Sequence, residues 1–307
     1  MNKVIILLGP TGVGKTGASI LLAKSLDTEI ISADSMQIYK GMDIGTAKPS
    51  IEQMAGVRHH MIDIVGPTEA YSVGRYIEEV VPVIDSLHKK GKIPIIVGGT
   101  GLYIKAMTRG IFSGPSADWE LREELAALEE EQGGSLHSYL QELDPEAASK
   151  IMPPDKRRII RALEVCLKTR QGISELQKKA TSPLPCEFIK IGLTRDRKEL
   201  YKIIEERVDE MIKAGLVGEV KKITGMNPDK TPMQAIGYKE IAAHIDGKIS
   251  IEEAVGLIKK NTKRYAKRQF TWFKKEEGIH WINISGIYNS NEIFMHIRQV
   301  LGGLYAA

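Results

Sequence analysis

Runs of consecutive aliphatic residues alternate with stretches of helical periodicity in the first third of the chain. Residues 4–8, 28–33 and 93–97 are rich in β-branched and aliphatic side chains, which is typical of strands buried on both faces. Residues 17–24 are predicted to be helical, and residues 72–90 place apolar side chains on one helical face before a glycine. Strands that alternate with helices predict an α/β fold with a doubly wound parallel sheet.

The charge pattern changes after Gly110. Residues 118–150 contain ten acidic and two basic residues, and residues 151–180 contain eight basic and three acidic ones, both with helical spacing. A linker with two prolines follows, and residues 188–193 resume the strand pattern. We therefore predict that an all-helical insertion interrupts the α/β core. The predicted core comprises residues 1–112 and 188–307, and the predicted insertion comprises residues 113–187.

The last third of the chain is predicted to be mostly helical. Apolar residues recur with helical spacing in three stretches, and a short aliphatic strand and a final helix follow. The three helices are expected at residues 197–224, 232–246 and 250–275, and the strand at residues 279–284.

Composition excludes several classes of protein. The chain has 307 residues, of which 42% are hydrophobic and 27% charged, so it is neither disordered nor collagen-like. Its formal charge is only +4, so the placement of charge matters more than its sum. Cys166 and Cys186 have no CxxC spacing, which predicts neither a disulfide framework nor a zinc site and favours the cytoplasm. No apolar run approaches the roughly 18 residues that cross a bilayer, so we expect neither a membrane partner nor secretion.

A glycine-rich loop lies between the first predicted strand and the first predicted helix. It matches G-x-x-x-x-G-K-[ST] at every required position, in the context that this motif needs. Its backbone N–H groups and the helix N-terminus favour phosphate oxygens, Lys15 would neutralise the terminal phosphate, and the Thr16 hydroxyl would bind Mg²⁺. The sequence therefore predicts a polyphosphate site with Mg²⁺. The predicted phosphate-binding residues are Gly9, Pro10, Thr11, Gly12, Val13, Gly14, Lys15 and Thr16.

The residues that follow the next strands argue against a nucleotide-driven motor or switch. Such proteins usually hold Mg²⁺ with an acid after a second strand, but the strand at 93–97 ends in glycines and Thr100. Asp85 lies inside the predicted helix at 72–90, where a solvated position is expected. Asp34 closes the second strand, where it would act as a general base or merely cap the next turn. Ser35, Met36 and Gln37 follow it and are suited to recognising a flat base.

Cations and aromatic residues alternate between residues 259 and 275. This stretch has eight basic residues and no acidic one. On a helix, Lys260, Arg264, Lys267 and Thr271 would share one face, and Ile258, Tyr265 and Trp272 another. The pattern fits a surface that binds nucleic-acid phosphates, or equally a solvated helix with a buried aromatic side. Arg157, Arg158 and Arg161 form a second basic cluster, and His59 and His60 are expected to be structural because adjacent side chains point apart.

Taken together, these segments resemble the tRNA dimethylallyltransferase (tRNA isopentenyltransferase) family in its bacterial form. The resemblance extends over almost the whole chain in the family's order, and the zinc-finger extension of eukaryotic members is missing. One departure is Arg58, where the family pattern has proline, which affects a turn. Beyond the phosphate-binding loop, the matching segments are residues 34–49, 97–103, 157–165, 235–240 and 266–273.

The resemblance implies that a dimethylallyl group is transferred from dimethylallyl diphosphate to N6 of adenosine 37 in the tRNA anticodon stem-loop. It implies that Asp34 accepts the N6 proton, that Thr100 and Arg122 contact the tRNA, and that Arg207 is a further diphosphate ligand. No obligate protein partner is indicated. The tRNA contacts implied by the resemblance are Asp34, Ser35, Met36, Gln37, Thr100, Arg122, Arg157, Arg158, Arg161, Gly237, Tyr238, Lys267, Arg268, Gln269, Thr271 and Trp272.

Two other functions fit parts of this pattern. A small-molecule or nucleotide kinase would use the same loop for ATP, Asp34 for the acceptor hydroxyl and the arginine cluster as a lid. A non-enzymatic RNA-binding protein would leave the complete phosphate-binding loop without a purpose. Transfer of label from an allyl donor to tRNA would distinguish the transferase from both.

Overall fold

The computed structural model describes residues 2–112, 114–179 and 181–306. The chain divides into two compact units, Lys105–Leu184 and the remainder on either side of it. The predicted insertion at 113–187 begins earlier in the structure, because the last residues of helix α4 (Gly101–Arg109) belong to the inserted unit. It also ends earlier, because the larger unit resumes at Pro185. The predicted first residue of the insertion, Ser113, lies outside the described residues.

All strands of the larger unit lie in one parallel sheet of order β3-β2-β4-β1-β5-β6. This order confirms the predicted doubly wound sheet. The residues of β1 are fully buried from Val4 onward, as the aliphatic run predicts. Strand β3 was not predicted because two polar residues give no strand signal. The strands are β1 (Lys3–Leu8), β2 (Ile30–Ala33), β3 (His59–His60), β4 (Ile95–Gly98), β5 (Glu187–Thr194) and β6 (Ile279–Asn283).

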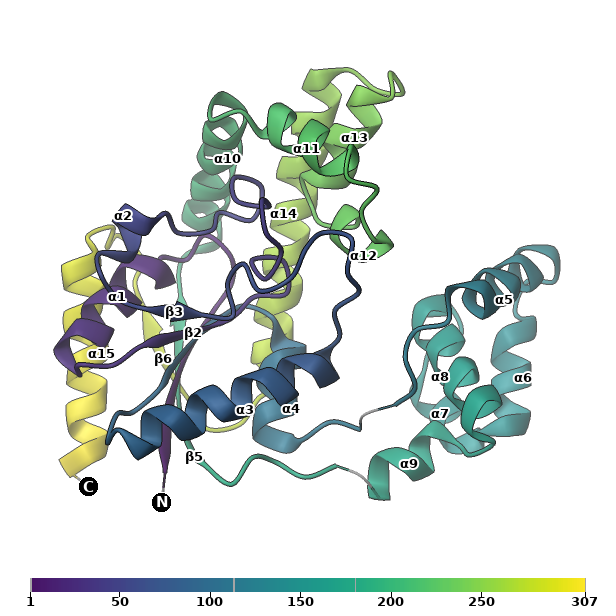
Figure 1. Cartoon of the computed structure of the whole chain (residues 1–307), viewed down its shortest axis with the longest axis horizontal. Coiled ribbons are helices and arrows are strands. Elements are labelled where there is room, and N and C mark those ends of the chain that lie inside the picture. Colours follow the sequence, from purple (N-terminus) through teal and green to yellow (C-terminus); the bar gives the residue numbers. More distant parts are fainter. Residues whose placement is uncertain (1, 113, 180, 307) are drawn as a thin grey trace. The chain divides into compact units, whose positions relative to one another are not determined.

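Helices cover both faces of the sheet. On one side, α1 (Lys15–Ser25) packs against α15 (Ser290–Ala306), and together they enclose one hydrophobic core. On the other side lie α3 (Val73–Lys89) and the start of α4 (Figure 1). The predicted helix at 72–90 is confirmed, and Asp85 is exposed on it, as expected.

Five further helices pack together at the carboxyl end of the strands (Figure 1). Two predicted helices are each divided in the structure. The predicted helix at 197–224 breaks at Gly215, and the one at 232–246 breaks at Gly237, because each glycine has a φ close to +100° that ends a right-handed helix. The five helices are α10 (Arg197–Lys213), α11 (Leu216–Thr224), α12 (Lys230–Met233), α13 (Tyr238–Ile245) and α14 (Ile251–Phe273). A short helix, α2 (Ile51–Met54), precedes β3.

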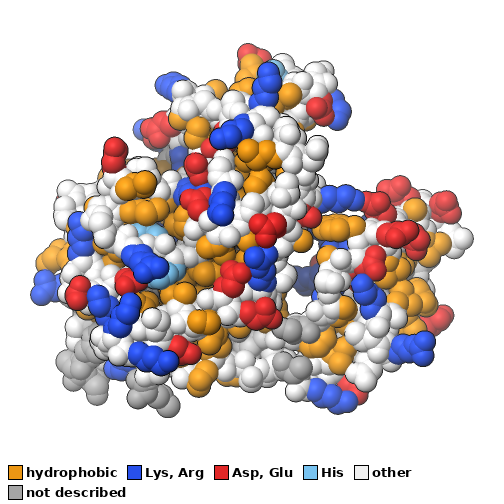
Figure 2. Space-filling model, viewed as in Figure 1, with side chains coloured by type: hydrophobic (Ala, Val, Ile, Leu, Met, Phe, Trp, Pro, Cys, Tyr) orange, Lys and Arg blue, Asp and Glu red, His pale blue; other side chains and the backbone are white. Residues whose placement is uncertain are grey.

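The described residues of the inserted unit form helices and connecting segments, as predicted. Leu125, Leu136, Leu140 and Leu163 meet in its own small core. Acidic side chains gather over α5 (Figure 2). Among the described residues, no helix is both long and apolar enough to cross a bilayer. The helices of this unit are α5 (Trp119–Glu131), α6 (Ser135–Leu143), α7 (Pro145–Lys150), α8 (Lys156–Thr169) and α9 (Ile173–Lys179).

Candidate active site

A crevice with two connected chambers opens at the carboxyl ends of β1, β2 and β4. The first chamber, of about 450 Å³, is polar and is lined by the glycine-rich loop, the end of β4 and one side of α10. The second, of about 270 Å³, is mostly apolar and is lined by side chains of α10 and α14 and by the segment before α13. The two chambers adjoin, because both are lined by Thr11, Asp34, Thr46, Ala47, Arg207 and Tyr265.

The glycine-rich loop has the backbone that a phosphate-binding loop requires. Gly12 and Gly14 have φ values of +79° and +112°, which only glycine adopts without strain, and α1 starts at Lys15 without a side-chain cap. The free N–H groups of this helix start favour an anion. Lys15 Nζ donates to the carbonyl oxygens of Gly9 and Pro10, each at 2.9 Å, so the ammonium group lies over the loop.

The surroundings of Lys15 in the crevice lower its pKa. Burial lowers the pKa of Lys15 to about 8, although the nearby Asp34 carboxylate opposes the shift. The ammonium group is therefore charged below pH 8 and becomes neutral as the pH rises through this value. An anion bound beside it would favour the charged form and raise the pKa again.

Binding of inorganic pyrophosphate is therefore expected to weaken above pH 8. Affinity should fall by up to about tenfold per pH unit, because Lys15 must take up a proton to bind the anion. Calorimetry between pH 7 and 9.5, in buffers of different ionisation enthalpy, would measure both the affinity and the proton uptake. The Lys15→Arg variant stays charged and should lack this part of the pH dependence. Equal pH profiles for the two proteins would contradict the assignment.

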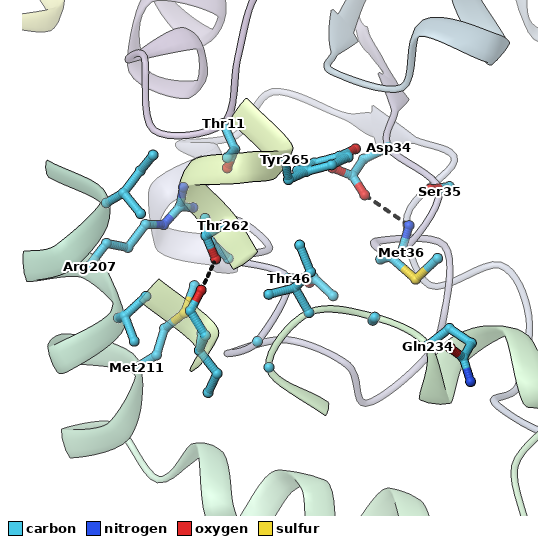
Figure 3. Close-up of a pocket in the computed structure, with 18 of the residues that line it drawn as sticks. Thr11, Asp34, Ser35, Met36, Thr46, Arg207, Met211, Gln234, Thr262 and Tyr265 are labelled. Carbon is cyan, nitrogen blue, oxygen red and sulfur yellow. Dashed lines mark hydrogen bonds between the residues drawn. The ribbon is translucent and has the colours of Figure 1, made fainter. Parts of the chain in front are cut away.

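Asp34 combines the two roles that the sequence left open. Its Oδ1 accepts hydrogen bonds from the backbone N–H groups of Met36 (2.8 Å) and Gln37 (3.3 Å), so one oxygen caps the turn after β2. Among the described residues, Oδ2 has no hydrogen-bond donor, and the carboxylate lines both chambers. Figure 3 shows Asp34 beside Tyr265. A carboxylate held by one oxygen and open at the other is suited to accepting a proton.

Three further side chains surround Asp34. The hydroxyl of Thr100 accepts a hydrogen bond from Ser35 N at 3.1 Å, which joins the ends of β2 and β4. Burial and the neighbouring carboxylate raise the pKa of Tyr265 to about 12, so its hydroxyl remains protonated. Arg207 lines both chambers, and burial lowers its pKa. The sequence reasoning placed Tyr265 only on an apolar helix face, since helical spacing does not show what that face contacts.

The apolar chamber lies next to these groups. Its wall includes Met36, the backbone of Gly237 and the segment 45–47 (Figure 3). Gln37 does not face this chamber. Its side-chain amide donates to the carbonyl oxygens of Thr46 and Ala47, both at 3.4 Å, and accepts from Ser32 at 3.1 Å. The apolar side chains of the wall from α10 and α14 are Ile204, Val208, Met211 and Ile258.

Two predicted tRNA contacts, Gln269 and Tyr238, have buried side chains in the structure. Gln269 is 7% exposed, and its amide accepts from Thr11 N and donates to Gly99 O, both at 2.9 Å. Tyr238 is fully buried, and its hydroxyl donates to Glu219. Both side chains hold segments of the crevice in place, and Gln269 also lines the polar chamber.

Three of the remaining predicted contacts on α14, Lys267, Arg268 and Thr271, are exposed. Lys267 and Thr271 share the exposed face, and Arg268 also lines the apolar chamber. Trp272 is half-buried and packs so closely on Gly101 that a Cβ there would lie 2.5 Å from the indole ring. The cationic face of α14 thus adjoins the crevice within the larger unit.

In the inserted unit, a buried carboxylate organises the predicted arginines. Glu164 is fully buried and accepts hydrogen bonds from Arg122 Nε (3.0 Å) and Nη2 (2.8 Å), from Asp118 N (2.6 Å) and from Arg161. Burial opposes ionisation, but these donors outweigh it and hold the pKa of Glu164 below its ordinary value. Arg157 and Arg158 are exposed on the same helix. Sequence pattern alone does not mark Glu164 as the centre of this cluster, because its partner Arg122 lies 42 positions away.

The residues set aside in the sequence have structural partners. His60 Nε2 bonds Glu29 Oε2 at 2.6 Å, and His59 Nδ1 bonds Val57 O at 2.9 Å, so the structural interpretation of this pair is confirmed. Cys166 and Cys186 are free, as expected. Within the described part of the chain, no three histidine, cysteine or acidic side chains come together as metal ligands.

Comparison with known proteins shows similarity over the full length. Residues 37–276 match the family model described as IPP transferase. The chain is 56% identical to the tRNA dimethylallyltransferase of Thermodesulfovibrio yellowstonii, over 98% of this chain and 99% of that protein. It is 49% identical to the tRNA dimethylallyltransferase of Thermotoga maritima, over 92% and 93% of the two chains.

Solved structures show the same fold. The crystal structure of the tRNA isopentenylpyrophosphate transferase of Bacillus halodurans superposes with a TM-score of 0.73 at 40% identity, covering 99% of this chain and 96% of that one. A eukaryotic dimethylallyltransferase, described as acting on tRNA, superposes with a TM-score of 0.74 at 32% identity, covering 92% and 74%.

Proposed function

Because the chain belongs to the IPP transferase family, we propose that it transfers a dimethylallyl group from dimethylallyl diphosphate to N6 of adenosine 37 in tRNA. The observation that carries this proposal is the joined pair of chambers. A phosphate-binding loop lines the polar chamber, an apolar chamber opens from it, and Asp34, Arg207 and Tyr265 stand where the two meet. An allyl diphosphate has the same polarity, with a charged end and an apolar end joined at the carbon that reacts.

The geometry supports a displacement at that carbon. The N6 lone pair of adenine attacks C1 of the dimethylallyl group, the C1–O bond breaks, and its electron pair leaves with the diphosphate. Fixed donors stabilise the charge that develops on the leaving oxygens, here the loop N–H groups with Lys15 and Arg207. The N6 proton passes to Oδ2 of Asp34, the carboxylate oxygen that does not cap the turn.

The donor set at the start of α1 fits a magnesium ion bound together with the diphosphate. Thr16 lines the polar chamber and carries a hydroxyl oxygen, and Mg²⁺ commonly takes one or two protein oxygens and completes its shell with phosphate and water. When bound, the ion would supply further charge neutralisation to the leaving group. Thr16 would hold it, and Lys15 would hold the adjoining phosphate oxygens.

The acceptor side of the proposal depends on α14. A base in an RNA loop must leave its stack to reach Asp34, and an anticodon loop presents its bases in this way. The exposed face with Lys267 and Thr271 would contact the RNA backbone, beside the chamber that Arg268 also lines. A tRNA substrate and two free cysteines fit the cytoplasm as the place of action.

The Lys267→Glu variant is expected to bind tRNA more weakly and with a smaller salt dependence. Because one phosphate contact is lost and a repulsive charge is added, the slope of log affinity against log salt should decrease by about 1 to 2. Filter binding at several salt concentrations would measure this slope. Lys24→Glu makes the same charge change on the exposed end of α1 and serves as the control. A slope equal to that of the wild type would show that this face of α14 does not meet the RNA.

A comparison of two possible donors tests the proposed reaction. Purified protein, Mg²⁺ and unmodified tRNA are incubated with labelled dimethylallyl diphosphate or with labelled ATP. We expect label to move from the allyl donor to tRNA and no consumption of ATP. Transfer of phosphate to a small molecule or to RNA would instead identify a kinase and overturn the proposal.

A further inference from the structure

The carboxylate of Glu219, on α11, accepts hydrogen bonds from the backbone of one wall of the crevice. The segment 43–47 follows Met42 in the long connection after β2, and its residues 45–47 line the apolar chamber. Glu219 Oε2 accepts the backbone N–H groups of Asp43 (3.0 Å) and Ile44 (2.8 Å), and Glu219 Oε1 accepts that of Gly45 (3.0 Å). One side chain thus binds three successive N–H groups across 174 positions of sequence or more. Such charge-assisted bonds are about twice as strong as neutral ones.

We call these three hydrogen bonds of Glu219 the clamp, and Tyr238 on α13 supports it. Its hydroxyl donates a hydrogen bond to Oε1 of Glu219, and burial together with this carboxylate raises its pKa, so the hydroxyl keeps its proton. Its ring lies against Gly45, where an added Cβ would come within 2.5 Å of a ring carbon. Gly45 is therefore required by close packing, and Tyr238 both orients the carboxylate and supports the segment.

The opposite side of the segment has separate supports. Gln37 donates to the carbonyl oxygens of Thr46 and Ala47, and Lys48 Nζ bonds Asp43 Oδ1 and Asp63 Oδ1, each at 2.5 Å. These contacts hold the carbonyl side and the end of the segment. Among the described residues, Glu219 is the only one whose side chain accepts hydrogen bonds from the N–H groups of residues 43–45. The position of the chamber wall therefore depends on this carboxylate.

We propose that Glu219 is a positioning residue that fixes the segment 43–47 as a wall of the apolar chamber and so determines how tightly the allyl part of the donor is bound. The inference rests on the proposed function and deepens it. The carboxylate itself lines neither chamber, so it acts through the backbone that it holds. Gly45 lines only the apolar chamber, whereas Thr46 and Ala47 line both chambers and are also held by Gln37. Within the described part of the chain, the loop, Lys15 and Arg207 of the polar chamber have no contact with Glu219, so they stay in place when its hydrogen bonds are lost.

The Glu219→Gln variant distinguishes ligand binding in the apolar chamber from ligand binding in the polar chamber. A glutamine amide loses the charge and turns an N–H₂ group toward at least one backbone N–H donor, so the clamp cannot be completed. We expect dimethylallyl diphosphate to bind about tenfold or more weakly, because the wall contacts its hydrocarbon part. Inorganic pyrophosphate should bind within about twofold of the wild type, since the loop, Lys15 and Arg207 would hold it and, in the described structure, Glu219 contacts none of them. Calorimetry with Mg²⁺ and each ligand measures both affinities.

Control variants distinguish positioning from a general loss of structure. Glu253→Gln makes the same chemical change in a carboxylate that accepts Ser250 N at 2.9 Å at the start of α14, and it should leave both affinities unchanged. Gly45→Ala disturbs the same wall from the Tyr238 side and should reproduce the loss for the allyl ligand only. Should Glu219→Gln not fold, Gly45→Ala still provides the comparison.

Each result has a distinct meaning. Glu219→Gln and Gly45→Ala proteins that retain the preference of the wild type for dimethylallyl diphosphate over pyrophosphate overturn the inference but leave the proposed function standing. Equal weakening of both ligands also overturns it, because the residue would then support the whole crevice. A wild-type protein without any preference for the allyl ligand contradicts the proposed function itself, and with it the inference.

Discussion

Replacing Asp34 with asparagine is expected to slow transfer to tRNA by about 10²- to 10⁴-fold, the usual contribution of a general base. Asparagine retains an oxygen for the N–H groups of Met36 and Gln37, so the turn after β2 is preserved and only the proton acceptor is lost. Single-turnover transfer with saturating tRNA and allyl donor measures the chemical step. Binding of tRNA should remain within about threefold of the wild type.

This variant isolates chemistry from structure because it is nearly isosteric. Asp34→Ala removes the turn-capping oxygen as well, so it is expected to lower stability in addition to the rate. A rate for Asp34→Asn equal to that of the wild type would remove Asp34 from the proposed proton transfer, whatever the alanine variant showed.

Replacing Glu164 with alanine is expected to destabilise the inserted unit by about 3 kcal/mol. The change removes the buried acceptor of Arg122, Arg161 and Asp118 N, and unpaired buried charges of this kind cost roughly 3–5 kcal/mol. We use the lower end because both arginine side chains remain partly exposed, at 24% and 34%. Hydrogen exchange followed by mass spectrometry would locate the loss in α5 and α8.

The pH dependence of stability provides a second test of the contacts of Glu164. The pKa of Glu164 is lowered in the folded state, so its stabilising contribution is complete above the ordinary carboxyl pKa and is lost as the pH falls through the lowered value. The wild type should therefore lose protection in α8 on acidification. Protection in Glu164→Ala should be reduced at neutral pH and change less below it. Exchange rates in α5 and α8 that match the wild type at neutral pH would refute the role of this carboxylate.

The sequence predicted best those features that depend on neighbouring residues. The strand, glycine loop and helix around Lys15 follow from local pattern, and the parallel sheet then requires Asp34 to reach the same edge. The exposed face of α14 followed from helical spacing alone. In each case the physical cause lies within a few residues of the feature itself.

The sequence could not show those side-chain contacts whose partner lies far away in the chain. Gln269 occurs in a segment rich in cations, yet it bonds Thr11 N across 258 positions and is buried. No periodicity marks Glu164 or Glu219 as organising residues, since most of their partners lie on other elements. Arg161 is the exception, three positions before Glu164 on the same helix. The breaks at Gly215 and Gly237 were missed because an isolated glycine inside a helical pattern is tolerated, so its presence alone does not end the predicted helix.

The central claim is that the joined chambers hold an allyl diphosphate whose carbon end passes to an RNA nitrogen. The most direct test is mass spectrometry of nucleosides from unmodified tRNA after incubation with the purified protein, Mg²⁺ and dimethylallyl diphosphate, without ATP. We predict that one adenosine, at position 37, gains a C5H8 group, with one diphosphate released for each group transferred. Unaltered adenosine throughout the tRNA, with the protein folded and the donor intact, would contradict the account.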